Sequence, residues 1–307
     1  MVGLPTETVY GLAADAFNVE AVLKIFETKD RPRFDPLIVH LPDIVCLERV
    51  TQLPVEETQL VFDLVERFWP GPLTLVLPRR SVFSDVVTAG LETVAVRISA
   101  HPIFERIVQG LGRPLAAPSA NRFGRITPTT AGHVLAELDG RIPLIVDGGP
   151  TAHGLESTIV APRGGRIEIL RPGPITTEQL ARFAVIGEAA VRDRPEAPGQ
   201  LPSHYAPRTP FVLTADIDAF IPVTGKKTGA LCWTSTATQG FAEKRLLSAT
   251  GDLREAAANL FRYLRELDEA GLDLIVAEKL PETGLGRAIM DRLQRAAATL
   301  GGPDRPG

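Results

Sequence analysis

The sequence predicts an α/β protein with two domains. Short apolar runs rich in Val, Ile and Leu alternate with longer amphipathic stretches along most of the 307 residues, as strands alternate with helices. A hydrophobic content of 44% supplies enough apolar side chains for two separate cores. The periodicity stops over residues 187–210, where five prolines and several charges are typical of a linker. We therefore expect domains at 1–186 and 211–307.

Six strands are expected in the first domain, each a short apolar run of the kind that a sheet buries. They are 36–41, 73–77, 93–98, 143–148, 157–162 and 167–170. Asn18 is a suitable N-cap for the first helix, because its side chain can accept from the free backbone N–H groups. The apolar face of that helix is expected to consist of Val19, Val22, Ile25 and Phe26. Two further helices are expected over 56–68 and from Pro102 to just before Gly112.

The second domain repeats the alternation on a smaller scale. Strands are expected at 211–215, 228–233 and 272–280, with a long amphipathic helix over 253–270 and a closing helix over 286–300. No internal repeat relates the two domains. This pattern predicts a second, smaller α/β domain.

Composition excludes several classes of protein. Only two cysteines occur, Cys46 and Cys232, far apart and in apolar surroundings, which argues against a disulfide framework and a thiolate zinc site. No apolar run is long enough for a membrane span or a signal core, so a cytoplasmic protein is expected. A net charge of −4 and a pI near 5.8 disfavour a general binder of nucleic acids or membrane surfaces.

Common catalytic signatures are also missing, namely the GxxxxGK[ST], GxGxxG, GxSxG and HExxH motifs. The histidines have no metal-ligand spacing. They are His40, His101, His133, His153 and His204. The remaining candidates are polar residues at strand ends and in loops, where binding groups are usually mounted.

Two candidate stretches lie near the N-terminus. PTETVYGL, residues 5–12, places the hydroxyls of Thr6 and Thr8 before an apolar run, either as a surface turn or as a loop facing a ligand. In KDRPRFDPLIVH three cations precede a strand containing His40. They are Lys29, Arg31 and Arg33. Clustered cations suit phosphate oxygens, although a solvated basic turn has the same composition.

Four further candidates follow. Arg97 lies in the apolar run TVAVRI and must pair with an acid, either a structural carboxylate or that of a ligand. In APSAN, Ser119 and Asn121 are two residues apart and can point the same way. DGGPTAHGLEST ends in Ser157 and Thr158 at a strand start, and LRPG holds Arg171 before a proline. Apart from Arg97, each of these also has an ordinary explanation as a turn.

In combination these motifs resemble the threonylcarbamoyl-AMP synthase family, the YrdC-like proteins, in its long form with an additional C-terminal domain. The resemblance extends over nearly the whole chain. It rests on PTETVYGL, K-x-R-P, PLIVH, FWPGPLT, TVAVR, APSAN, DGG, ESTIV, LRPG, HYAP and GLGRAIMDR, in this order.

The resemblance implies a YrdC-like twisted, open mixed sheet with flanking helices, followed by a smaller Rossmann-like α/β domain. It implies a nucleotidyltransferase that converts L-threonine, bicarbonate or CO2 and ATP into threonylcarbamoyl-AMP and pyrophosphate, with Mg²⁺ on the phosphates. The product would feed the downstream machinery that transfers threonylcarbamoyl to tRNA adenosine. A contact with tRNA itself is left open.

The family's binding positions transfer to this sequence residue by residue. For L-threonine they are Thr8, His40, Arg97, Ala117 and Ser157. For ATP they are Lys29, Arg31, Asp35, Thr93, Ser119, Asn121, Thr127, Arg171 and His204. Lys29, Arg31 and Ser119 are expected to act most directly in catalysis. His204 lies in the linker, which we expect to close over the nucleotide as a lid that excludes water.

Three features depart from the family pattern. The family normally has a helix and a strand before the opening motif, which here comes only four residues after Met1, so we expect either a misassigned start site or a missing edge of the sheet. Asp35 replaces a common Asn and would repel phosphates unless magnesium or Arg31 offsets it. Pro202 stands where a tyrosine is common, which would remove one stacking contact from the lid.

Two other functions fit parts of the sequence. A YrdC-like fold can present a basic concave face, so a non-catalytic RNA-binding protein is the main alternative. The overall acidity and the candidate contacts for both substrates count against it. A carbamoyl-transfer enzyme related by fold is a third reading, but such chains carry zinc-finger and transferase modules that this sequence lacks.

Overall fold

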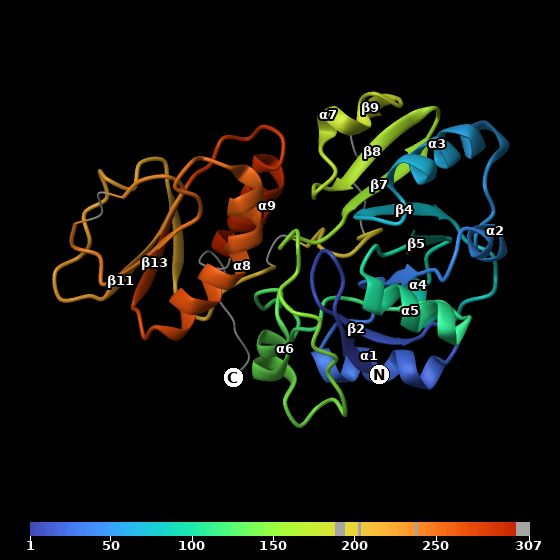
Figure 1. The fold of residues 1–307 in the computed structure, drawn as a ribbon, viewed down its shortest axis with the longest axis horizontal. Helices are drawn as coiled ribbons and strands as arrows, with labels where there is room; N and C mark the ends of the chain where they lie inside the picture. Colours follow the sequence, from blue (N-terminus) through green and yellow to red (C-terminus); the bar gives the residue numbers. More distant parts are fainter. Residues whose placement is uncertain (188–193, 202–203, 237–238, 299–307) are drawn as a thin grey trace. The chain divides into compact units, whose positions relative to one another are not determined.

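The computed structural model describes residues 1–187, 194–201, 204–236 and 239–298, in two compact units (Figure 1). Unit 1 consists of Met1–Phe123 and Thr127–Leu201, and unit 2 of Gly124–Ile126 and Pro202–Gly307. The border after Leu201 falls inside the segment 187–210. Pro202, at which one departure from the family pattern was noted, lies outside the described residues.

Unit 1 is built on a nine-stranded mixed sheet in the order β1-β2-β6-β3-β5-β4-β7-β8-β9. The strands are β1 (Val2–Leu4), β2 (Gly11–Asp15), β3 (Ile38–His40), β4 (Leu73–Pro78), β5 (Thr93–Arg97), β6 (Leu115–Ala116), β7 (Thr158–Arg163), β8 (Arg166–Arg171) and β9 (Val185–Gly187). Three neighbouring pairs are parallel, namely β3 with β5, β4 with β7 and β8 with β9. The expected open mixed sheet with flanking helices is confirmed.

Helices connect these strands. They are α1 (Val19–Lys29), α2 (Val45–Val50), the 3₁₀ turn η1 (Val55–Glu57), α3 (Thr58–Phe68), α4 (Asp85–Thr88), α5 (Pro102–Leu111), α6 (Ala131–Leu138) and α7 (Thr177–Leu180). The predicted cap of α1 is confirmed, because the side chain of Asn18 accepts from the backbone N–H of Ala21 at 3.1 Å. The predicted apolar face needs one correction. Val19 is 41% exposed, since a side chain in the first turn points back beyond the helix end.

The two faces of the sheet are covered differently. One face packs against α1, α2 and α3 in the main core, with Val39 and Val96 among its strand residues. Side chains alternate along a strand, so the neighbours of these residues point to the opposite face. Small and apolar side chains such as Ala95 and Ala161 line the middle of that face. At its β3 and β5 ends it carries His40 and Arg97 instead.

The predicted strand over 143–148 is wrong. Ile145 forms one isolated parallel bridge with Gly3, through hydrogen bonds on either side of it. Pro143 has no N–H to donate, and Asp147-Gly148-Gly149 turns the chain away, so the apolar run does not extend into a ladder. Four short strands were not predicted as ranges, namely β1, β2, β6 and β9. In the structure β1 is an edge strand, and it leads directly into the PTETVYGL turn.

Unit 2 contains a four-stranded parallel sheet in the order β10-β13-β11-β12. Its elements are β10 (Phe211–Thr214), β11 (Thr228–Cys232), β12 (Glu243–Leu246), α8 (Leu253–Glu269), β13 (Leu274–Glu278) and α9 (Gly286–Ala297). The expected smaller Rossmann-like α/β domain is confirmed. Strand β12 was missed because its sequence, EKRL, is mostly charged. In neither unit do the described residues form a helix long and apolar enough to cross a membrane.

Candidate active site

The candidate site begins where β3 and β5 end side by side. His40 and Arg97 are the last residues of these parallel strands and are direct register partners. Both side chains are buried. The PTETVYGL turn lies against them, since Nη1 of Arg97 donates to Oγ1 of Thr8 at 3.0 Å. Three predicted threonine-binding residues are therefore brought together.

Arg97 also has a carboxylate partner that sequence reasoning missed. Its Nη2 pairs with Oε1 of Glu7, and the hydroxyl of Ser99 donates to the other oxygen of the same carboxylate. Nε of Arg97 has no partner among the described residues. Glu7 was detectable in principle, because a carboxylate just before a buried strand needs a cation, as Arg97 needs an acid.

Electrostatics fixes the charge states at this end of the site. Burial raises the pKa of Glu7, but Arg97 and the Ser99 hydroxyl outweigh it and hold that pKa below its usual value. Burial and the neighbouring guanidinium lower the pKa of His40 to about 3. His40 is therefore neutral at physiological pH, and its Nδ1 has no hydrogen-bond partner in the described part of the chain. The imidazole can offer a polar atom to a ligand without adding charge.

A second group of charges lies around the end of α1. Lys29, the last residue of that helix, donates from Nζ to the carbonyl of Ser119 at 2.6 Å and also to that of Asn121. Burial and the nearby Arg31 hold the pKa of Lys29 well below its usual range. The side chain of Arg33 is exposed. The K-x-R motif and APSAN thus meet, and the alternative of a solvated turn holds only for Arg33.

Asp35 is neutralised by a neighbour rather than left facing ligands alone. Its carboxylate lies 2.9 Å from Nη2 of Arg31, which also donates to the carbonyl of Pro36. Burial raises the pKa of Asp35, opposed by the charges of Arg31, Lys29 and Arg171. Magnesium and Arg31 were the two groups expected to offset the negative charge of Asp35, and the structure places Arg31 beside it.

Arg171 is held by the start of β7. It donates to the carbonyl of Ser157 from Nε and Nη2, and to its hydroxyl at 3.2 Å. The same hydroxyl lies 2.7 Å from Oγ1 of Thr74 on β4. Thr74 was missed, although a threonine in the apolar run LTLVL carries the same signal as Arg97 in TVAVRI. Ser157 and Arg171, predicted to contact different substrates, are thus in contact with each other.

The remaining predicted site residues make their contacts with other parts of the chain. The N–H of Ala117 donates to the carbonyl of Ile38 on β3. Thr127 donates to the carboxylate of Glu156 at 2.5 Å. Thr93 begins β5, at the end of the strand away from Arg97. His204 belongs to unit 2, where it packs edge-on against Tyr205 with ring centroids 4.1 Å apart.

Glycines in two motifs permit close packing beside these residues. A Cβ on Gly148 of DGG would lie 2.7 Å from the ring of Pro5, which opens the PTETVYGL turn. A Cβ on Gly173 of LRPG would lie 2.5 Å from the backbone nitrogen of Thr158. Any larger residue would push these segments apart. Tyr10, fully buried, adds a hydrogen bond from its hydroxyl to the carbonyl of Gly149 at 2.8 Å.

Comparison with known proteins places the chain in a family. Residues 1–173 match the Sua5, YciO and YrdC family, described as telomere recombination. Residues 175–298 match the C-terminal domain of threonylcarbamoyl-AMP synthase.

Individual relatives match over nearly the full length. The threonylcarbamoyl-AMP synthase of Bacillus subtilis is 43% identical over 97% of this chain and 89% of the relative. That of Pyrococcus abyssi is 39% identical over 97% and 90%.

Two solved structures, both of P. abyssi Sua5, have the same fold. The crystal structure with L-threonine has a TM-score of 0.86 at 39% identity, over 96% of this chain and 90% of the other. A variant with an adjacent histidine and tyrosine changed to alanine also has a TM-score of 0.86, at 38% identity over 96% and 88%. This chain belongs to the threonylcarbamoyl-AMP synthase family, in the form that combines the YrdC-like domain with the additional C-terminal domain.

Proposed function

We propose that this protein is an L-threonylcarbamoyladenylate synthase, an ATP-dependent nucleotidyltransferase that acts on L-threonine and bicarbonate or CO2. The observation that carries the proposal is the 43% identity to a named threonylcarbamoyl-AMP synthase over 97% of the chain. Its product serves the threonylcarbamoyl-adenosine modification of tRNA and passes to the machinery for that transfer. We expect the reaction to take place in the cytoplasm.

The β3 and β5 ends form the threonine pocket. Arg97 binds the carboxylate of the amino acid with its forked guanidinium, because that geometry matches a carboxylate and Nε is still unpartnered. Thr8, which already contacts Arg97, and the neutral His40 supply uncharged polar groups beside it. The backbone at Ala117 and the hydroxyl of Ser157 complete the contacts. The crystal structure of a P. abyssi relative in complex with L-threonine supports L-threonine as the ligand.

The cations around α1 form the nucleotide end. In the reaction, the threonine amine and bicarbonate give a carbamate and water. A carbamate oxygen then attacks the α-phosphorus of ATP, and the bond to pyrophosphate breaks. No enzyme nucleophile is needed, so the protein contributes position and positive charge. Lys29 and Arg31 stabilise the negative phosphate oxygens, and Ser119 positions the nucleotide.

The family resemblance predicts further nucleotide contacts. They are Asp35, Thr93, Asn121, Thr127, Arg171 and His204. Of these, Arg171 adds charge close to Lys29 and Arg31, since all three act on Asp35. We expect the linker around His204 to act as the lid. The single His-Tyr pair of this chain, His204–Tyr205, lies there.

We expect magnesium to reach the site already bound to ATP. No group of three or more His, Cys, Asp or Glu side chains able to hold a metal occurs among the described residues. Asp35, a carboxylate beside the nucleotide cations, is paired with Arg31. Mg²⁺ commonly keeps its waters and binds through substrate phosphates with few protein ligands. We therefore expect MgATP to bind as a preformed complex.

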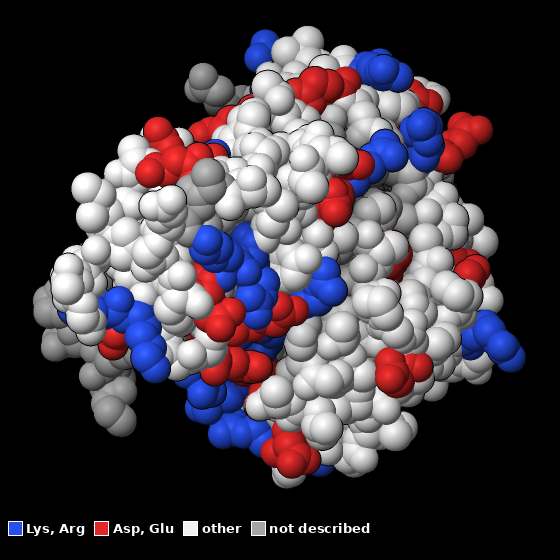
Figure 2. Space-filling model, turned by 60° about the vertical axis from the view of Figure 1, so that its left-hand side comes forward, with Lys and Arg blue, Asp and Glu red and all other residues white. Residues whose placement is uncertain are grey.

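The RNA-binding alternative is less well supported. Figure 2 shows Lys and Arg interspersed with Asp and Glu on the face drawn, without an extended area of positive charge. The net charge of −4 agrees with that distribution. An RNA-binding surface normally gathers basic residues on one face.

The test is incubation of the purified protein with MgATP, bicarbonate and labelled L-threonine. We expect pyrophosphate and a threonine-containing adenylate in equal amounts, both dependent on bicarbonate. Salt-dependent RNA binding with no adenylate formed would reverse the order of the two functions.

A further inference from the structure

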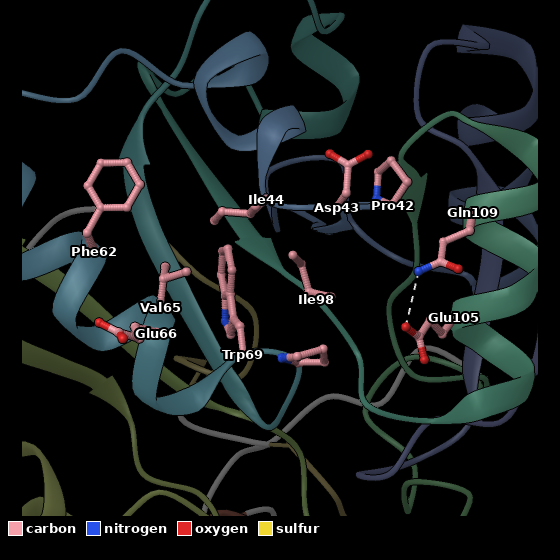
Figure 3. A pocket seen from close by; sticks show the side chains of 11 residues that line it. Pro42, Asp43, Ile44, Phe62, Val65, Glu66, Trp69, Ile98, Glu105 and Gln109 are labelled. Atoms are coloured by element: carbon pink, nitrogen blue, oxygen red, sulfur yellow. Dashed lines mark hydrogen bonds between the residues drawn. The ribbon is translucent and has the colours of Figure 1, made fainter.

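A cavity in unit 1 lies outside the proposed active site. It has a volume of about 450 Å³ and is bordered by the segment 42–44 before α2, by α3 and α5, and by Trp69 and Ile98 (Figure 3). Ile98 follows Arg97 directly but packs in the main core, together with residues of α1, α2 and α3. Arg97 and its partners point to the opposite face. None of the residues that line the cavity is assigned to threonine or ATP.

The floor of the cavity is apolar. It is made by Ile44, Val65, Trp69 and Ile98. Ile44 remains 40% exposed, which is unusual for a side chain of this kind beside a core. The indole nitrogen of Trp69 donates to the carbonyl of Leu73 at 2.7 Å, so the ring is fixed by the protein. A fixed aromatic ring among aliphatic groups is a typical anchor site for a partner side chain.

The edge of the cavity is acidic. Figure 3 shows the carboxylates of Asp43, Glu66 and Glu105 around Trp69 and Ile98. Asp43 accepts from the N–H of Cys46, and Glu105 accepts from the amide of Gln109, but neither bond removes the charge. No Lys or Arg lines the cavity, and none of the three carboxylates has an ion-pair partner among the described residues.

We propose that this cavity, which we call the acidic pocket, binds a segment of a partner protein that presents an aliphatic side chain flanked by Lys or Arg. The apolar floor accepts the aliphatic group, and the carboxylates attract the cations. One cation can also lie against the ring of Trp69. A segment fits better than a small cation, because carboxylates on separate sides of the floor are reached together only by a ligand with several separated charges.

The test uses Trp69 as a reporter. The chain has two tryptophans, so Trp233→Phe leaves Trp69 as the single one. Full-length protein with this substitution is titrated with the blocked peptide KALLKA, while fluorescence is recorded. Two control peptides are EALLEA, with reversed charges, and KASSKA, without the aliphatic anchor. We expect saturable binding of KALLKA and binding at least roughly 10-fold weaker for both controls.

A pair of variants tests the contribution of the carboxylates. Glu66→Lys reverses one charge at the edge, near the end of α3. Glu27→Lys makes the same change near the end of α1, outside the pocket, and both residues are exposed. We expect the Kd for KALLKA to rise roughly 3- to 10-fold with Glu66→Lys and to stay within about 2-fold with Glu27→Lys.

Several results would overturn the proposal. They are equal binding of KALLKA and EALLEA, no fluorescence change at millimolar peptide, and equal losses in the two variants. Self-association that changes Trp69 emission without peptide, and that Glu66→Lys removes, would assign the pocket to a second copy instead. Adenylate formation, measured with and without saturating peptide, should be unchanged. A protein that makes no adenylate but binds KALLKA selectively would refute only the proposed enzymatic function.

Discussion

At the scale of the residue, a buried guanidinium is stabilised by two neighbouring residues of one turn. Arg97 contacts both Glu7 and Thr8, and Ser99 holds the second oxygen of Glu7. A buried ion pair is stable only when its remaining polar atoms are also satisfied. Here Nε of Arg97 is still available, and it lies in the region assigned to the threonine carboxylate.

The fork of Arg97 should matter more than its charge. Arg97→Lys keeps a cation beside Glu7 but loses the paired donors, so we expect the KM for threonine to rise about 10-fold or more. The KM for ATP should change by less than about 2-fold, because the cations around α1 are untouched. Steady-state pyrophosphate release measures both values. Arg106→Lys, an exposed change on α5, is the control. Equal changes in both KM values would contradict the carboxylate assignment.

His40 should make the protein less stable in mild acid. Its pKa is about 3 in the folded protein, against 6.5 for the free group. Between these values the unfolded chain binds more protons, so stability falls as pH falls through that window. By pH 5 this amounts to roughly 2 kcal/mol. We expect His40→Asn to reduce the loss in unfolding free energy between pH 7 and pH 5, measured with urea.

The control for this prediction is His101→Asn. Burial also lowers the pKa of His101, but that side chain is only half-buried, so its effect should be smaller. The comparison uses the difference between the two pH values and not the absolute stability, which both substitutions can alter. An identical pH dependence in wild type and His40→Asn would show that His40 titrates normally.

At the scale of the element, strand register assembles the site. Parallel pairing of β3 with β5 sets His40 beside Arg97, and parallel pairing of β4 with β7 sets Thr74 near Ser157. Each pair joins residues that are distant in sequence. Helix α1 adds Lys29 at its end, close to the carbonyls of Ser119 and Asn121. The positions of the polar groups therefore depend on how the strands pair.

The hydrogen bond between the hydroxyls of Thr74 and Ser157 can be tested with a matched pair of substitutions. Thr74→Val keeps the shape of the side chain but removes the hydroxyl that lies 2.7 Å from Ser157. Because Thr74 is fully buried, we expect a loss of about 1–2 kcal/mol in unfolding free energy and a higher KM for threonine. Thr74→Ser retains the hydroxyl and should recover most of the KM. If Val and Ser behaved alike in kinetics, the hydroxyl would have no role in positioning Ser157.

At the scale of the whole molecule, two units of different construction share one chain. Unit 1 has a mixed sheet with polar side chains on one face, and unit 2 has a short parallel sheet. The segment Gly124–Ile126 groups with unit 2, where Arg265 donates to the carbonyl of Ile126. In the same unit, Arg292 from the GLGRAIMDR motif lies 5.1 Å from the ring of Tyr205. The HYAP and GLGRAIMDR motifs therefore contact and stabilise each other.

The proposed lid can be tested through His204. We expect His204→Ala to lower the yield of adenylate per ATP consumed by several-fold, because water then reaches the mixed anhydride, while ATP binding changes little. His204→Phe keeps a ring against Tyr205 and separates packing from polar contact. The ratio of adenylate to pyrophosphate is the measurement. An unchanged ratio in both variants would remove His204 from the lid. Deletion of residues 199–207 should lower the adenylate yield more than ATP binding, and an unchanged yield would refute the lid as a whole.

The α/β class, the main helices and strands, and the family can all be predicted from the sequence alone. These follow from periodicity, from caps such as Asn18 and from motifs whose spacing is fixed along the chain. The sequence also singled out Arg97, because a charge inside an apolar strand must have a partner wherever the strand lies.

The identity of the partner of Arg97 depends on how the chain folds. Glu7 and Arg97 are 90 residues apart, and Thr74 and Ser157 are 83 apart, so their contacts depend on the order and register of strands. The apolar run at 143–148 shows the same limit, because backbone pairing beyond one bridge requires a neighbour at the right register and not only a suitable sequence. Local chemistry thus selects the elements, while long-range pairing decides which side chains meet to form the site.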